Sequence, residues 1–195
     1  MNWPNRLTIL RIILSPLFFV IYFLPAWTGG AAAVAAVAVA VIFVIIEVSD
    51  VLDGYIARRY GMVTDLGKLI DPFADVMGRM TYFFCFTLSG LMPAWIFLVL
   101  LYRELGVTFL RMVLIRRGSA MAASVWGKAK AMTYALGGVL GVVYYAMDGM
   151  EAGTSLVMPV LGRAALIVFV LGAISSVLSF ITYVVKAVPE LKDNV

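Results

Sequence analysis

Long apolar stretches follow one another along almost the whole chain, and they constrain its fold more than any other feature. Of its 195 residues, 64% are hydrophobic and 13% are charged, which is more apolar surface than a soluble domain of this size buries. A bilayer core about 30 Å thick needs about 20 apolar residues of helix. The sequence therefore predicts an all-α membrane protein with about six transmembrane helices. The expected spans are Leu7–Trp27, Ala31–Val51, Pro72–Leu91, Pro93–Ile115, Val125–Met147 and Val157–Val185.

Lysine and arginine are distributed unevenly between the two sets of expected loops. Cationic loops are retained on the cytoplasmic side, and with the N-terminus inside only Arg163 is clearly external. We therefore expect both termini in the cytoplasm, with residues 1–195 forming one transmembrane domain in the inner cell membrane. The apolar run after Arg6 is expected to be a retained first span, because no small-residue cleavage site closes it before Pro25.

Histidine is absent from the chain, and Cys85 is its one cysteine. The lack of histidine removes the usual general base, the usual zinc ligand and every Ser/His or Cys/His nucleophile. A single cysteine provides neither a disulfide framework nor a thiolate cluster. Any acid–base or metal chemistry therefore falls to carboxylates.

Four aspartates lie close together in residues 49–75, SDVLDGYIARRYGMVTDLGKLIDPFAD. Asp50 and Asp53 are three residues apart and share one face of the second expected helix, near its cytoplasmic end. Asp71 and Asp75 are four residues apart and share one face of the next helix. The two pairs are therefore expected to converge.

Four carboxylates at a membrane interface repel one another and lose hydration, so they require neutralisation. Hard divalent cations neutralise them well, because such ions prefer oxygen ligands. Two such ions clamp the attacking and leaving oxygens of an in-line displacement at phosphorus. We therefore expect transfer of a phosphate-linked group at a two-metal site held by Asp50, Asp53, Asp71 and Asp75. Mg²⁺ or Mn²⁺ is the expected ion, and Ca²⁺ has the same preference for oxygen ligands.

Small and basic residues accompany the aspartates. Gly54 and Gly67 leave room for a nucleotide beside the helix backbone, and Ala57 is also small. Arg58 is a cation able to bind phosphate oxygens bidentately. Taken alone, Asp71 before a proline resembles a helix N-cap and Arg58 resembles a topology-setting charge. The joint spacing of these residues favours a binding site instead.

The pattern Asp50-x2-Asp53-Gly54-x2-Ala57-Arg58-x8-Gly67-x3-Asp71-x3-Asp75 matches the signature of the CDP-alcohol phosphotransferases without a substitution, and the chain resembles that family. The resemblance implies a six-helix membrane enzyme, expected to be a homodimer, that transfers a substituted phosphate group from a CDP-linked donor to an alcohol and releases CMP. It implies that the four aspartates bind metal and that Asp75 takes the proton from the attacking hydroxyl. It also implies a CDP site lined by Gly54, Ala57, Arg58 and Gly67.

Shorter segments resemble the bacterial phosphatidylglycerophosphate synthases of this family. They are residues 4–11 (PNRLTILR), 64–68 (TDLGK), 103–104 (RE), 110–111 (LR) and 126–130 (WGKAK). This resemblance implies CDP-diacylglycerol as donor and glycerol 3-phosphate as acceptor, with phosphatidylglycerol phosphate and CMP as products in phospholipid biosynthesis. The expected partners are these substrates and membrane lipids, rather than nucleic acid.

Basic residues in the fourth and fifth expected helices favour a phosphorylated acceptor. A negatively charged acceptor binds a group of cations more readily than neutral serine or inositol does. The predicted acceptor-binding residues are Arg103, Arg111 and Lys128. Three other basic residues are interpreted as topology-setting charges, namely Arg116, Arg117 and Lys130.

Three positions leave the acceptor open. Phosphatidylglycerophosphate synthases commonly carry lysine directly after the last aspartate, and Val76 stands there. Arg79, one turn further on, either supplies the missing cation or indicates another acceptor. Glu47, one turn before Asp50, is either a partner for a cation or an interfacial charge. Transfer to inositol phosphate, serine or a choline-type alcohol is the alternative hypothesis.

Three other classes of membrane protein compete with a transferase. A prenyltransferase carries two acidic motifs far apart, whereas here the acids form one block. A cation transporter places acids near the bilayer midplane, whereas these cluster at one interface. A purely structural protein has no need for this density of acids. The acidic block therefore favours the transferase.

Overall fold

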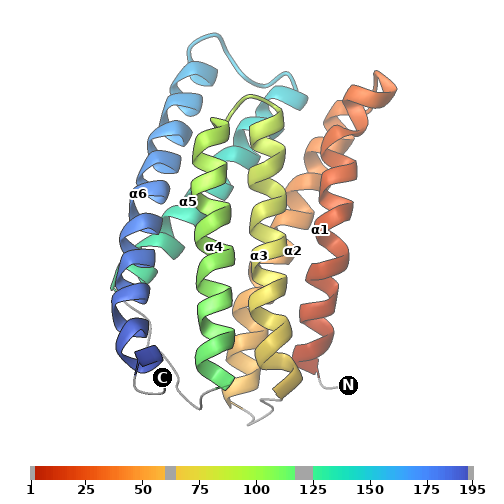
Figure 1. The fold of residues 1–195 in the computed structure, drawn as a ribbon. Helices are drawn as coiled ribbons and strands as arrows, with labels where there is room; N and C mark the ends of the chain where they lie inside the picture. The colour runs from red at the N-terminus through yellow and green to blue at the C-terminus, as the bar shows by residue number, and fades with distance from the viewer. Residues whose placement is uncertain (1–2, 60–64, 117–124, 193–195) are drawn as a thin grey trace.

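The computed structural model describes residues 3–59, 65–116 and 125–192, and α-helices make up most of this part of the chain (Figure 1). No strand occurs within these three ranges, so the all-α prediction is confirmed. The helices are α1 (Trp3–Thr28), α2 (Ala32–Arg59), α3 (Asp65–Leu88), α4 (Ala94–Arg116), α5 (Val125–Gly149) and α6 (Val157–Lys192).

Three of these helices are long and apolar enough to cross a membrane, judged by length and composition over the described residues. Their candidate spans are Arg6–Thr28, Ala32–Leu52 and Val157–Pro189. The helices α3, α4 and α5 have 24, 23 and 25 residues, which is also enough to cross. However, α3 and α4 carry charged side chains, and α5 is rich in glycine and tyrosine. The membrane class is confirmed, whereas six spans and the orientation stay predictions.

One helix boundary differs from the expectation in a way that concerns the site. The structure begins α3 at Asp65, seven residues before the expected span from Pro72, and Asp71 lies within the same helix as Asp75, as expected. The carboxylate of Asp71 accepts a hydrogen bond from Oγ1 of Thr8 at 2.6 Å. The Asp71 side chain therefore contacts α1, whereas its position before Pro72 resembles that of a helix N-cap.

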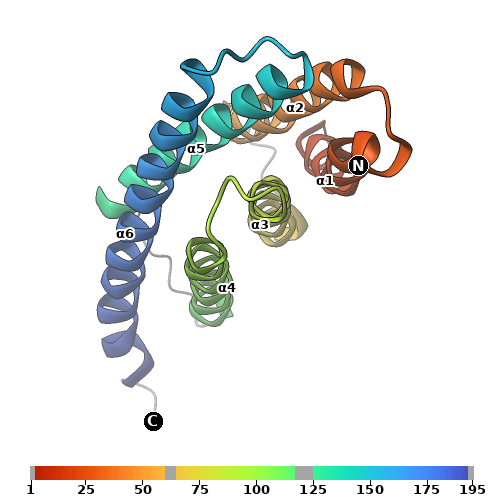
Figure 2. The same ribbon diagram turned by 90° about the horizontal axis from the view of Figure 1, so that it is seen from above.

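Successive helices run in opposite directions, so α1 begins and α6 ends at the same end of the bundle (Figure 1). Viewed along the bundle, α2, α5 and α6 curve around one side of α1, α3 and α4 (Figure 2). The central helix α3 packs against α1, α4 and α5. The starts of α1, α3 and α5 therefore meet the ends of α2, α4 and α6 at one end of the bundle, which is called the charged end below.

An aromatic core joins the helices above the charged end. The ring of Tyr82 on α3 lies 5.3 Å from that of Phe43 on α2, measured between centroids, and both side chains are buried. On α5, Gly141 faces the ring of Phe86, where an added Cβ would lie 2.3 Å from the nearest ring atom. Small residues permit such close packing between helices in lipid. The glycine therefore sets how near α5 lies to α3.

Candidate active site

Asp50 of α2 and Asp75 of α3 converge on a single arginine of α1. Nη1 of Arg11 donates to Oδ1 of Asp50 at 2.8 Å and also to Oδ1 of Asp75. The Arg11 side chain is 1% exposed, whereas each carboxylate is 29% exposed. Arg79 of α3 donates to the other oxygen of Asp50, Oδ2, at 2.8 Å. Two predicted metal ligands are thus brought together, with two guanidinium groups balancing their charge.

The first helix also reaches a third predicted ligand. Thr8, one turn before Arg11, donates the hydrogen bond to Asp71 described above. Sequence reasoning matched residues 4–11 only by resemblance and assigned no role to Thr8 or Arg11. The available signal was the charge of Arg11 inside the first apolar run, because a charge within a membrane span is costly unless it is paired.

Several predicted site residues have side chains outside the part that the structure describes. They are Asp53, Gly54, Ala57 and Arg58 on α2, and Gly67 on α3. Their roles in binding metal and CDP therefore stay predictions. Among the described residues, no group of three or more acidic, cysteine or histidine side chains is close enough to hold a metal ion.

The pair formed by Asp50 and Asp75 nevertheless suits a hard divalent cation. Magnesium is usually bound through one or two carboxylates, while water and substrate phosphates complete its shell. The pair presents oxygen donors from two helices, and Asp53 follows Asp50 by three residues on the same helix. Softer metals prefer sulfur or imidazole ligands, which this group lacks. The donor set therefore fits Mg²⁺ or Mn²⁺.

A polar cavity of about 210 Å³ opens beside Asp75 and is called the cationic cavity below. Asp75 and Arg79 line it on one side, and both also line a narrow hollow that contains Arg11 and Asp50. These two side chains thus separate the cavity from Arg11 and Asp50. The basic side chains lining the cationic cavity are Arg79, Arg103, Arg111 and Lys130.

A buried network holds two of these cations in place. Oε1 of Glu104 accepts hydrogen bonds from Nη1 of Arg103 at 2.9 Å and from Nζ of Lys130 at 2.7 Å. Nη2 of Arg103 donates to Oγ of Ser179 on α6 at 2.8 Å. The buried charge of Arg103 is thus paired with Glu104. Two cations share one carboxylate, so the network carries net positive charge and suits an anionic ligand.

The predicted acceptor residues are not all brought together. Arg103 and Arg111 line the cationic cavity, and Nη2 of Arg111 also donates to the hydroxyl of Tyr183 at 2.8 Å. Lys128 is exposed and lies outside the lining, whereas Lys130 is buried within it. Residues two apart on a helix point about 200° away from each other. The structure therefore places Lys130, rather than the predicted Lys128, in the cavity lining, and the role of Lys128 in binding the acceptor stays a prediction.

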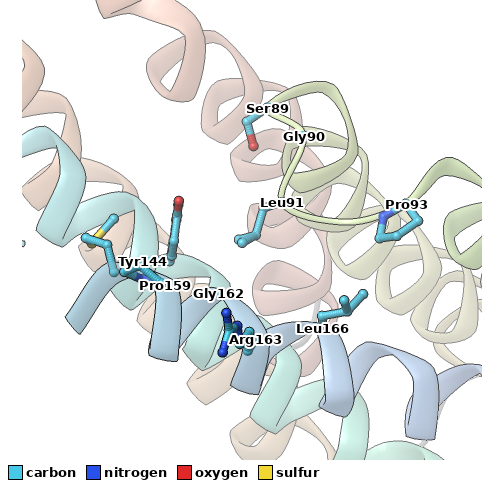
Figure 3. A pocket seen from close by; sticks show the side chains of 10 residues that line it. Ser89, Gly90, Leu91, Pro93, Tyr144, Pro159, Gly162, Arg163 and Leu166 are labelled. Carbon is cyan, nitrogen blue, oxygen red and sulfur yellow. The ribbon is translucent and has the colours of Figure 1, made fainter. Parts of the chain in front are cut away.

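A larger cavity, of about 490 Å³, lies at the opposite end of the bundle (Figure 3). It is bounded by the turn after α3, including Gly90 and Leu91, and by Gly162 and Arg163 near the start of α6. Its described lining contains one cation and no acid. This cavity therefore lacks the paired carboxylates and clustered cations that a phosphate-transfer site requires.

Fold and site together define a membrane protein of bundled helices with an acidic pair and a cationic cavity side by side at one end. Residues 1–181 match the model of the CDP-alcohol phosphatidyltransferase family, and the chain belongs to this family. It is therefore an enzyme of the transferase class, as the acidic block predicted.

Curated relatives align with about two thirds of the chain. The CDP-diacylglycerol–glycerol-3-phosphate 3-phosphatidyltransferase of Treponema pallidum is 36% identical over 146 residues, covering 72% of this chain and 67% of that protein. The Bacillus subtilis protein of the same name is 38% identical over 135 residues, covering 66% of this chain and 70% of its own length. A probable phosphatidylglycerophosphate synthase of Mycobacterium tuberculosis is 37% identical over 135 residues, covering 69% of this chain and 63% of its own length.

Proposed function

We propose that this enzyme transfers the phosphatidyl group of CDP-diacylglycerol to glycerol 3-phosphate, forming phosphatidylglycerol phosphate and CMP. The observation that carries the proposal is the position of Asp75, which is joined to Asp50 through Arg11 and also lines a cavity with four cations. The names of the relatives from Treponema pallidum and Bacillus subtilis state the same donor and acceptor and support it.

The charge of the cationic cavity favours an acceptor that carries phosphate. Arg103 and Lys130 share the single carboxylate of Glu104, so a bound phosphate would complete the balance of charge. Arg111 adds a further guanidinium, which binds phosphate oxygens bidentately. Serine has no net charge and choline-type alcohols are cationic, so both lack the negative charge that these groups attract. Glycerol 3-phosphate has this charge together with a free hydroxyl.

Asp75 is the proposed base that takes the proton from the attacking hydroxyl. Its carboxylate lines the cationic cavity, so an acceptor whose phosphate lies against Arg103 and Lys130 can direct a hydroxyl toward it. Arg11 donates a hydrogen bond to this carboxylate from the narrow hollow on its other side. The histidine that usually performs this step is absent from the chain.

Asp50, Asp53, Asp71 and Asp75 are the proposed ligands of Mg²⁺ or Mn²⁺. When bound, such ions neutralise the diphosphate of the donor and the charge that develops on the leaving CMP oxygen. The proposed CDP site beside them is lined by Gly54, Ala57, Arg58 and Gly67. The enzyme is further proposed to be a homodimer in the inner membrane, on the basis of the family resemblance. The distribution of basic residues supports a charged end that faces the cytoplasm.

An acceptor panel tests the proposal. Purified enzyme is supplied with labelled CDP-diacylglycerol and Mg²⁺ or Mn²⁺, and CMP release is measured with glycerol 3-phosphate, myo-inositol phosphate, serine and choline in parallel. We expect release above the acceptor-free rate with glycerol 3-phosphate alone. Faster release with inositol phosphate or a neutral alcohol would reassign the cationic cavity, and no release with any acceptor would contradict the reaction.

A further inference from the structure

Arg11 contacts the two carboxylates at which the proposed divalent cation binds. One nitrogen atom, Nη1, donates to Oδ1 of Asp50 from α2 and to Oδ1 of Asp75 from α3. A divalent ion held by both carboxylates would need the position between their oxygens that Arg11 takes here. Arg79 donates to Oδ2 of Asp50 instead, so it does not take this position.

The guanidinium and a divalent ion cannot occupy the bridging position together. Like charges a few ångströms apart repel strongly in the low dielectric of a partly buried site. The Arg11 side chain is 1% exposed, so its charge has little access to water when it leaves the carboxylates. A displaced Arg11 therefore needs another carboxylate nearby.

Glu47 is placed to provide that carboxylate. It lines the same narrow hollow as Arg11, Asp50 and Asp75, and its side chain accepts a hydrogen bond from the hydroxyl of Tyr82 at 3.3 Å. The family signature has no acid at this position. The start of α1 is held to α3 by the hydrogen bond from Thr8 to Asp71. Transfer of the Arg11 guanidinium to Glu47 would therefore move the Arg11 side chain and not the helix.

We propose that Arg11 is a positioning residue that competes with the divalent cation for Asp50 and Asp75, and that Glu47 receives its guanidinium when the metal binds. Arg11 thereby sets the metal affinity of the site and keeps the two carboxylates paired before the metal arrives. The inference rests on the proposed metal site and adds a role for residues outside the signature.

The test is a Mn²⁺ titration of the purified full-length protein in a neutral detergent, without donor or acceptor. Free Mn²⁺ is measured by electron paramagnetic resonance for wild type, Arg11→Gln, Glu47→Gln and the double variant. Removing the charge-assisted bonds of Arg11 is expected to tighten Mn²⁺ binding about tenfold or more. Arg59→Gln, which removes an exposed arginine near the same end of α2, is the matched control and should change affinity less than about twofold.

The double variant separates the exchange from a general effect of charge. Glu47→Gln alone should weaken Mn²⁺ binding about threefold or more, because the displaced guanidinium loses its partner. If Glu47 acts through Arg11, the same substitution should have almost no effect in the Arg11→Gln background. Equal effects of Glu47→Gln in both backgrounds would overturn the role given to Glu47.

Two further variants keep the result interpretable. Arg11→Lys retains the charge near the carboxylates while losing the guanidinium geometry, so it should fold and bind Mn²⁺ about threefold more tightly than wild type. Unchanged or weaker binding in the folded Arg11 variants would overturn the inference. Asp50→Asn tests the metal site itself: if it leaves Mn²⁺ binding unchanged, both the site and this inference fail, whereas sensitivity to Asp50→Asn with no effect of Arg11 removes the inference alone.

Discussion

Nζ of Lys130 lies 2.7 Å from Oε1 of Glu104, and this ion pair joins α5 to α4 at the wall of the cationic cavity. The two side chains are 7% and 8% exposed, and Arg103 approaches the same oxygen at 2.9 Å. One buried carboxylate thus holds two cations beside Asp75. The proposed acceptor site is positively charged because two cations, Arg103 and Lys130, share the single carboxylate of Glu104. A bound phosphate would therefore compete with one acid for two cations.

Replacing Lys130 with methionine should weaken the binding of glycerol 3-phosphate. The substitution keeps an unbranched side chain but removes a charge-assisted bond to phosphate, so KM should rise about tenfold or more. Lys128→Met is the matched control, because Lys128 is exposed and lies outside the cavity lining. Steady-state kinetics with varied glycerol 3-phosphate measures both effects, and an equal change in KM for the two variants would argue against the cavity as the acceptor site.

Replacing Glu104 with glutamine should destabilise the protein and make its stability depend on the acceptor. Without the carboxylate, Arg103 and Lys130 lose their shared counter-charge, at a cost of about 3 kcal/mol in the free energy of unfolding. Bound phosphate should partly replace that counter-charge. Thermal unfolding with and without glycerol 3-phosphate should show a lower Tm and a larger ligand-induced rise than in wild type. A rise no larger than that of wild type would contradict this assignment.

Replacing Thr8 with valine should lower turnover while keeping the volume of the side chain. The valine loses the 2.6 Å hydrogen bond to Asp71, and a bond to a charged group contributes about 1.5–3 kcal/mol. We expect kcat to fall about tenfold and Thr8→Ser, which retains the hydroxyl, to remain near wild type. A larger loss in Thr8→Ser than in Thr8→Val would indicate that the methyl group, and not the hydrogen bond, is what matters.

Replacing Gly141 with alanine should weaken the packing of α5 on α3. The added Cβ would lie 2.3 Å from the ring of Phe86 in a closely packed core, and overpacking of this kind costs about 1–3 kcal/mol. The control is Gly172→Ala on α6, where the nearest atoms would lie 3.7 Å away and alanine also has the higher helix propensity. Thermal unfolding should show a lower Tm for the first variant only; equal values would contradict close packing at Gly141.

Local patterns were enough to predict most of the fold and part of the site. Apolar stretches of helical length repeat along the chain, so the helices follow from the sequence by simple rules. The spacing from Asp50 to Asp75 predicted that acids from α2 and α3 converge, and Arg11 confirms this for those two residues by contacting both. The family resemblance then indicated the class of reaction, which the family match confirms.

Contacts between distant segments could not be predicted in the same way. Arg11 is 39 residues from Asp50 and 64 from Asp75. No local pattern in the sequence shows which face of α1 turns toward α2 and α3. Which of Lys128 and Lys130 lines the cavity depends on contacts of the same kind. Both lie at the start of α5, and only packing against other helices, above all α6, determines which of two nearly opposite faces turns inward, where Lys130 reaches Glu104 of α4.

The most direct test of the account is acceptor-dependent CMP release by Asp75→Asn, measured with CDP-diacylglycerol, glycerol 3-phosphate and Mn²⁺. The amide cannot take the hydroxyl proton, so the rate should fall about a hundredfold or more while the donor still binds. Turnover close to that of wild type would contradict the role of Asp75 and the arrangement of the site around it.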